Sequence, residues 1–251
     1  MGVFLGAPRI PVSTHVDASL AQRRVVHMAT SLLLDYPDEQ LTQIITAVRH
    51  DRDLMPTVVA DEITAFCGVA ESWGLRALQE HYVETFDQHR RCALYLSYYS
   101  AGDTRERGAA ILGFREVMRS AGFELDHANE LPDYLPVVLE FSARASEGDT
   151  LLRANREALE VIRSALVTTS SPYAHLLEGL CLILSPLDEK TLARYQNSSV
   201  RGRPLRWWVS PPRIPYQPSG GSCEHKSIGM AGTALSVDHP PHRRDDLAVP
   251  H

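Results

Sequence analysis

Three side chains with a spacing suited to metal binding lie near the middle of the chain. His81, Glu84 and Asp87 recur every three residues, so a helix over this segment would place them near one face. Imidazole and carboxylate groups bind divalent metals, and such a triad could form half of a metal centre in a helical enzyme. A di-metal bundle uses Glu-x-x-His pairs on facing helices, which these three residues do not supply. The pattern therefore favours an acidic patch that faces solvent or a partner, with a helical metal-binding enzyme as the alternative.

The commonest catalytic motifs are absent from the sequence. It contains no G-x-x-x-x-G-K-[ST], G-x-G-x-x-G, G-x-S-x-G or H-E-x-x-H pattern, which removes the usual phosphate, dinucleotide, acyl-transfer and zinc-protease sites. The four cysteines, Cys67, Cys92, Cys181 and Cys223, form no C-x-x-C pair, so neither a zinc ribbon nor a dithiol redox site is indicated. Cys67 and Cys181 are expected to be small core residues.

The charge distribution argues against a nucleic-acid partner. Residues 1–200 carry 27 acidic and 18 basic side chains, a net charge of −9, and the rest of the chain carries +3. A protein that neutralises phosphates needs a basic face, which this acidic body lacks. The acidity either attracts a basic partner or keeps the domain in solution. No run of 18 apolar residues is present, so we expect no membrane insertion. The widely spaced cysteines make a reducing cytoplasm the expected location.

Apolar periodicity near 3.6 residues dominates the first 200 positions and predicts an all-α fold, an irregular bundle of about eight to ten helices. Helices are expected over residues 17–34, 41–48, 56–73, 75–89, 104–121, from about 136 to 145, 152–166, 173–184 and 185–195. Gly148 and Asp149 are expected to separate the sixth of these from the seventh. We predict a flexible N-terminus over residues 1–16, a helical domain over 17–200, and a mostly disordered Pro/Gly/His-containing tail over 201–251.

The segment from His81 to Phe114 concentrates aromatic, acidic and arginine side chains without a catalytic arrangement, and it is interpreted as a recognition surface. Tyrosine offers a large contact area and a polar tip at low entropic cost. Core packing remains an equal alternative for each tyrosine. A second segment, Glu130–Phe141, is expected to contribute to the same surface. The predicted binding residues of the two segments are Tyr82, Glu84, Asp87, Tyr95, Tyr98, Tyr99, Asp103, Arg107, Glu130, Pro132, Asp133 and Tyr134.

Three sequence stretches, in this order, carry a family resemblance. They are LLLDYPDE at 32–39, the YVETFD…RRC-LYL-YY-GDTR-RG pattern at 82–108, and ELPDYLPVVLEF at 130–141. Together they resemble the NarJ-type nitrate reductase assembly chaperones of the TorD-like family. The family's E-x-P-D-[HY] signature maps onto Glu130, Pro132, Asp133 and Tyr134, where other branches often have histidine at the last position.

The resemblance implies a cytoplasmic, all-helical chaperone with no catalysis and no bound cofactor. Its client would be the N-terminal segment of the apo nitrate reductase α subunit, held until molybdenum cofactor insertion and released before membrane docking. Cofactor-delivery proteins are a further candidate partner, and a different molybdoenzyme of this class or a subunit that stays with its complex are alternatives. We expect an apolar groove between residues 82–99 and the helix at Pro132–Phe141, with acids including Asp133 at its rim, to accept a client helix.

Overall fold

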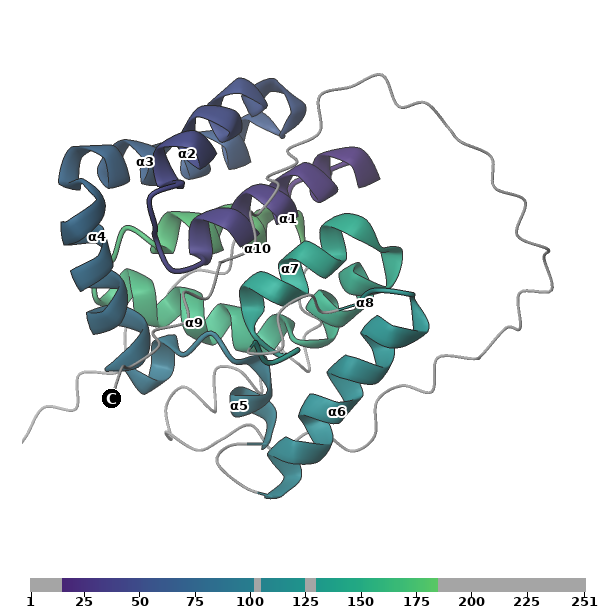
Figure 1. The fold of residues 1–251 in the computed structure, drawn as a ribbon. Coiled ribbons are helices and arrows are strands. Elements are labelled where there is room, and N and C mark those ends of the chain that lie inside the picture. The colour runs from purple at the N-terminus through teal and green to yellow at the C-terminus, as the bar shows by residue number, and fades with distance from the viewer. Residues whose placement is uncertain (1–14, 102–104, 125–129, 185–251) are drawn as a thin grey trace, which may run out of the picture. The chain divides into compact units, whose positions relative to one another are not determined.

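The computed structural model describes residues 15–101, 105–124 and 130–184. These residues form ten α-helices and no strand, which confirms the all-α prediction for this part of the chain (Figure 1). The predicted helix at 185–195, the tail at 201–251 and the first fourteen residues lie outside the described residues. The elements are α1 Leu20–Leu34, α2 Leu41–His50, η1 Arg52–Leu54, α3 Thr57–Trp73, α4 Leu75–Tyr82, η2 Val83–Asp87, η3 Arg90–Cys92, α5 Leu96–Ala101, α6 Arg105–Ser120, α7 Leu135–Arg144, α8 Ser146–Ala154, α9 Arg156–Thr168 and α10 Ala174–Ile183.

Helix α1 is the central element, packed against α7, α10 and α2. Its start is fixed by a capping box, in which Ser19 Oγ accepts from the Gln22 N–H and the Gln22 side chain accepts from the Ser19 N–H. One face of the helix is fully buried, including Val26 and Leu34. The helix expected over residues 17–34 is therefore confirmed, and its apolar face supplies the middle of the core.

Helix α3 follows the sequence signals closely. Pro56 precedes the first residue of α3, where a missing N–H costs nothing. Gly74 ends α3 with φ 76°, a left-handed value that glycine adopts without steric cost. Helix α3 packs on α10, and both carry a buried cysteine, since Cys67 is 0% and Cys181 1% exposed. Burial raises the pKa of Cys67 to about 11 and that of Cys181 to about 12, so both are inert core residues as predicted.

The structure departs from the expected helices at three places. The helix predicted over 75–89 ends as α4 at Tyr82 and continues as a single π-helical segment, η2. The helix predicted across 152–166 is two helices that meet at Asn155, and Gly148 lies inside the first of them rather than in a break. Helix α5 was missed altogether, because six residues are too few to show a period.

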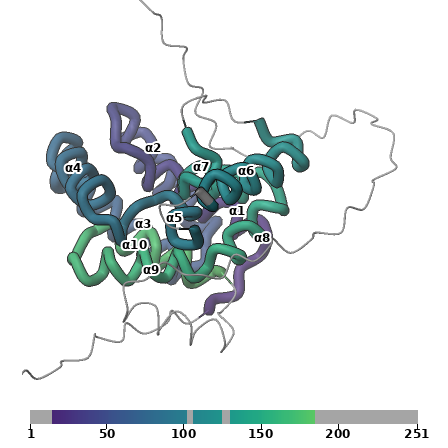
Figure 2. Tube along the Cα trace, turned by 90° about the horizontal axis from the view of Figure 1, so that it is seen from below, coloured from purple at the N-terminus to yellow at the C-terminus, as the bar shows by residue number. Residues whose placement is uncertain are grey.

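Helix α4 lies at one end of the described helices, and α6 and α8 lie at the other (Figures 1 and 2). Helix α5 packs against α6 and α9 between them. Within residues 15–101, 105–124 and 130–184, no helix has both the length and the apolar character that crossing a bilayer would require.

Candidate functional site

Three of the predicted tyrosines meet in one place, and we call Tyr82, Tyr95 and Tyr134 the tyrosine cluster. The hydroxyl groups of Tyr82 and Tyr134 are hydrogen-bonded at 2.8 Å. The rings of Tyr95 and Tyr134 pack with their centroids 5.4 Å apart. The Tyr134 hydroxyl donates to Asp35 Oδ1 at 3.3 Å. The cluster thus joins α4, the chain before α5 and the start of α7 to the end of α1.

The backbone holds the second and third tyrosines together. The Leu96 N–H donates to the Asp133 carbonyl at 2.9 Å, and the Leu135 N–H donates to the Leu94 carbonyl at 2.8 Å. We call residues 94–97 and 133–135 the paired segments. Tyr95 and Tyr134 form an isolated antiparallel bridge within them. The two predicted recognition segments are therefore bonded to each other at this point, where the sequence suggested an open groove.

Asp133 is fixed inside the paired segments. Its Oδ2 accepts from the Ser97 hydroxyl at 2.5 Å and from the Ser97 N–H at 3.3 Å. Arg107 Nε donates to the same hydroxyl at 3.3 Å, and its guanidinium lies 5.6 Å from the Tyr95 ring centroid. Because Asp133 is 0% exposed, the expectation that it lies at the rim of a groove is wrong, and its carboxylate instead binds the first turn of α5.

The twelve predicted binding residues differ widely in exposure. Glu84, Asp87 and Glu130 are exposed, and Tyr95, Tyr98 and Arg107 are half-buried. Five are buried, namely Tyr82, Tyr99, Pro132, Asp133 and Tyr134. Asp103 lies outside the described residues. Tyr99 has a structural role, since its hydroxyl donates to the carbonyls of Arg91 and Ala93 at 2.9 and 2.8 Å, and its ring packs edge-on against Tyr98 at 5.7 Å.

Exposed carboxylates surround the tyrosine cluster, and we call Asp35, Asp87 and Glu130 the acidic rim. Burial is the main cause that raises the pKa of all three tyrosines. The nearby negative charges raise it further. Asp35 and Asp87 act on Tyr82, Asp87 and Glu130 act on Tyr95, and Asp35 and Glu130 act on Tyr134. The rim therefore gives this part of the surface a negative potential at neutral pH.

An exposed aromatic ring completes the surface. Tyr36 is 49% exposed and packs edge-on against Tyr82, with ring centroids 5.4 Å apart. Tyr36 and Asp35 were not among the predicted binding residues, although both belong to the LLLDYPDE stretch. In the sequence they contributed to the family resemblance and were not assigned a binding role. A signal for them exists in the sequence: an aromatic residue stands beside an acid in the connection between two helices, where neither side chain is needed to form a helix.

The metal triad suggested by the sequence is not assembled. His81 Nε2 is hydrogen-bonded to Ser171 Oγ at 2.9 Å and to Thr85 Oγ1 at 3.1 Å. Burial lowers the pKa of His81, and the Glu84 charge partly opposes this shift. Across the described residues, His81, Glu84 and Asp87 do not bring their ligand atoms together as a metal site would require.

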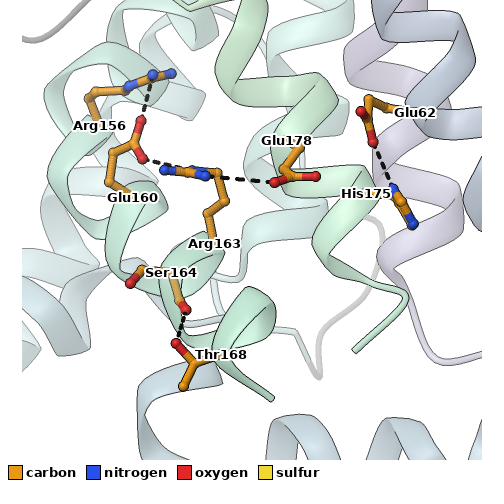
Figure 3. Close-up of polar contacts among 8 residues, drawn as sticks. All are labelled: Glu62, Arg156, Glu160, Arg163, Ser164, Thr168, His175 and Glu178. Atoms are coloured by element: carbon orange, nitrogen blue, oxygen red, sulfur yellow. Dashed lines mark hydrogen bonds and ion pairs between the residues drawn. The ribbon is translucent and has the colours of Figure 1, made fainter. Parts of the chain in front are cut away.

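A chain of charged side chains lies elsewhere, on α9, α10 and α3 (Figure 3). Glu160 is 0% exposed and binds Arg156 at 2.6 Å and Arg163 at 2.8 Å. Arg163 in turn lies 3.8 Å from Glu178. Burial and the neighbouring Glu62 raise the pKa of Glu178, whereas Arg163 and His175 lower it. The two Glu160 pairs lie within α9 and require each partner to remain charged. The Arg163–Glu178 pair, and a hydrogen bond from Arg156 Nη1 to the Cys181 carbonyl at 2.8 Å, connect α9 to α10.

A small cavity of about 290 Å³ lies between η3 and α9. It is lined by residues 88–92 and by α9 residues that include Ser164 and Thr168. The Thr168 hydroxyl donates to the Ser164 carbonyl at 2.7 Å (Figure 3), so that hydroxyl is already engaged within the helix. The cavity does not include any member of the tyrosine cluster or the acidic rim.

Comparison with known proteins places the sequence among nitrate reductase assembly proteins. Residues 52–178 match the family described as nitrate reductase delta subunit. The probable nitrate reductase molybdenum cofactor assembly chaperone NarJ of Bacillus subtilis is 33% identical over 166 residues, covering 64% of this chain and 89% of that protein. The nitrate reductase molybdenum cofactor assembly chaperone NarJ of Escherichia coli K12 is 29% identical, covering 60% of this chain and 65% of that protein.

A third relative is much longer. The nitrate reductase-like protein NarX of Mycobacterium tuberculosis H37Rv is 36% identical over 169 residues, which are 62% of this chain and only 24% of that protein. The two NarJ relatives are assembly chaperones and not catalysts, in agreement with the prediction that this chain is not an enzyme. The chain therefore belongs to the nitrate reductase delta subunit family and is a chaperone of the NarJ type.

Proposed function

We propose that this protein is a cytoplasmic chaperone for the catalytic α subunit of a respiratory nitrate reductase. It binds the N-terminal segment of the apo subunit and assists molybdenum cofactor insertion and assembly before the enzyme docks at the membrane. The names of its NarJ relatives support the assembly role. Binding of a peptide segment is supported by the acidic rim around the tyrosine cluster.

The observation that carries the proposal is the acidic rim around the tyrosine cluster, with Tyr36 exposed beside it. The exposed Tyr36 ring and the half-buried Tyr95 ring offer contact area. They pack on the buried rings of Tyr82 and Tyr134, so binding costs little further rotamer freedom. The three rim carboxylates attract a segment that carries lysine or arginine, and they orient it during encounter. The client would therefore lie over the outer side of the tyrosine cluster, since the paired segments close the space between residues 94–97 and 133–135.

Apolar contact and charge have different tasks on such a surface. Burial of client side chains supplies about 25 cal/mol per Å² of apolar area before ordering costs are deducted. Exposed charge pairs contribute little to affinity at physiological salt, about 0.2–1 kcal/mol each, but they raise the association rate. We therefore expect client binding that weakens with salt and depends strongly on Tyr36.

The test is calorimetric titration of the full chain with a synthetic peptide copied from the first residues of the α subunit. The double variant Asp87→Asn/Glu130→Gln should bind several-fold more weakly at low salt and show a smaller salt dependence. Glu80→Gln is the matched control, because Glu80 is an exposed acid on α4 that pairs with Arg76 in the preceding turn, at 3.1 Å. Absence of peptide binding at high concentration and low salt would refute the proposal.

A transient chaperone differs from a permanent subunit in what it accompanies. We expect the chain to co-purify with cofactor-free α subunit and to be absent from the mature membrane-bound enzyme. Stoichiometric recovery with the mature enzyme would instead support a structural subunit. A peptide from another molybdoenzyme that binds more tightly than the nitrate reductase peptide would reassign the client but keep the surface.

A further inference from the structure

Two closely packed helices bring three possible metal ligands together. Glu62 lies on α3, and His175 and Glu178 lie on α10 (Figure 3). One ligand atom of each lies within 4.8 Å of the other two. His175 and Glu178 are three residues apart, so both project from one face of α10. Their side chains are 31–39% exposed, which leaves an approach from solvent.

The helix backbones are held at a fixed spacing beside these side chains. Gly179 follows Glu178, and a Cβ atom there would lie 3.4 Å from Val59 Cγ1 and 3.6 Å from Glu62 Cβ. The two helices therefore touch directly next to the cluster. Ligands presented by rigid, packed helices need only side-chain rotation to reach a bound ion.

We propose that Glu62, His175 and Glu178 form a binding site for a divalent first-row transition metal, with Zn²⁺ as the ion tested. Carboxylate oxygen and imidazole nitrogen bind Zn²⁺ at about 2.0–2.2 Å, which puts tetrahedral ligand atoms about 3.4 Å from one another. His175 Nδ1 and Glu62 Oε2 lie 2.7 Å apart, and all three ligand atoms lie within 4.8 Å of one another. Three protein ligands leave the fourth position of the metal to water.

The charges around the cluster favour a cation. The charged side chains drawn in Figure 3 include three carboxylates, those of Glu62, Glu160 and Glu178, and two guanidinium groups, those of Arg156 and Arg163. Glu160 engages both arginines at 2.6–2.8 Å, whereas Arg163 lies 3.8 Å from Glu178. The two carboxylates of Glu62 and Glu178 therefore lie close together with too little positive charge nearby to neutralise both, and they repel each other. A metal ion between them would remove this repulsion and cross-link α3 to α10.

The experiment is a competition titration of Zn²⁺ between a chromophoric chelator and the full chain, purified without an affinity tag. Because the C-terminal tail offers other imidazoles, the parent protein carries the changes His225→Gln, His239→Gln, His242→Gln and His251→Gln. We expect one Zn²⁺ per chain, unaffected by millimolar Mg²⁺. Glu62→Gln, His175→Gln and Glu178→Gln should each lower the affinity by about tenfold or more.

The matched control is Glu71→Gln, which changes another α3 acid that is bound to Arg49 at 2.7 Å and should leave Zn²⁺ affinity unchanged. Zn²⁺ should also raise the melting temperature of the parent and not that of Glu178→Gln, since a ligand that binds only the folded state stabilises it. Melting curves without metal show whether each variant folds, and any one folded ligand variant suffices. Absence of Zn²⁺ binding, or equal affinity in the parent and a folded ligand variant, would overturn the proposal.

Discussion

Acid should weaken this fold through one buried imidazole. His27 in α1 is 1% exposed, and its Nδ1 is hydrogen-bonded to Ser142 Oγ of α7 at 2.9 Å. Burial lowers the pKa of His27 from 6.5 to about 4, Asp149 opposes this shift, and Arg23 adds to it. The imidazole therefore lies neutral between the two helices that pack most extensively.

The sign of the pH effect follows from proton binding. Between pH 6.5 and 4 the unfolded chain binds a proton at His27 and the folded chain does not, so the free energy of unfolding falls as the pH falls. The contribution is fully present above pH 6.5. A shift of this size corresponds to roughly 3 kcal/mol lost by pH 4, because each pKa unit is worth about 1.4 kcal/mol. That is a large part of the typical stability of a domain.

Urea unfolding between pH 4.5 and 7.5 measures this effect. The wild type should lose stability steadily below pH 6.5, and His27→Gln should lose less over the same range, since glutamine does not titrate. His50→Gln is the control, because His50 is exposed at the end of α2, and it should behave as the wild type. Carboxylates contribute to all three proteins at low pH, so the difference between variants is the relevant quantity. An unchanged pH slope in a folded His27→Gln variant would refute the assignment.

Two further predictions concern stability alone and are checked by urea or thermal unfolding. Gly148→Ala should lower the free energy of unfolding by about 1–3 kcal/mol, because the new Cβ would lie 2.5 Å from Ser142 N. Gly68→Ala is the control: it lies in an exposed part of α3 with nothing within 4 Å and should stabilise the fold by about 0.5–1 kcal/mol. Equal effects of the two changes would contradict the close contact of α7 and α8. Glu160→Gln should cost about 3–5 kcal/mol, because it leaves two buried guanidinium groups short of a countercharge. Glu71→Gln, which breaks an exposed pair, should cost at most about 1 kcal/mol, and a similar small loss for Glu160→Gln would show that the buried charges are hydrated.

Helices were predictable where a long apolar period coincided with a start or stop signal. Helix α3 has both, since Pro56 precedes it and Gly74 ends it. The break at Asn155 was not predictable, because the apolar positions on either side keep the same period across it. At Gly148 the error was the opposite one, because a helix break was expected there and the residue lies inside α8. Its small size serves the contact with Ser142, and a sequence alone does not distinguish that use of glycine from a helix end.

Binding residues were predictable as segments and not as individual exposed side chains. The clustering of Tyr82, Tyr95 and Tyr134 depends on the pairing of residues 94–97 with 133–135, a contact between segments nearly forty residues apart that no local pattern encodes. The Glu62–His175–Glu178 cluster was missed for the same reason. Its members come from two helices, and Glu62 and His175 are 113 residues apart in the sequence, whereas the metal pattern visible in the sequence joined ligands one turn apart.

The burial of Asp133 distinguishes two roles that the stretch ELPDY at 130–134 could have. Its carboxylate accepts hydrogen bonds from Ser97 and is 0% exposed, so a client has no access to it. Asp133→Ala should therefore lower the free energy of unfolding by about 1–3 kcal/mol, because it leaves the buried Ser97 donors without this acceptor. The folded fraction should bind the α-subunit peptide with unchanged affinity and salt dependence.

Asp87→Asn should give the opposite pair of results, because Asp87 is exposed. Its melting temperature should match that of the wild type, and its peptide affinity should fall at low salt as one rim charge is lost. Melting curves and calorimetric titrations of both variants under the same buffer conditions provide the comparison. Should Asp133→Ala melt like the wild type and yet bind the peptide weakly and without salt dependence, the carboxylate would have to act in recognition, and the packing of the paired segments would have to open when the client binds.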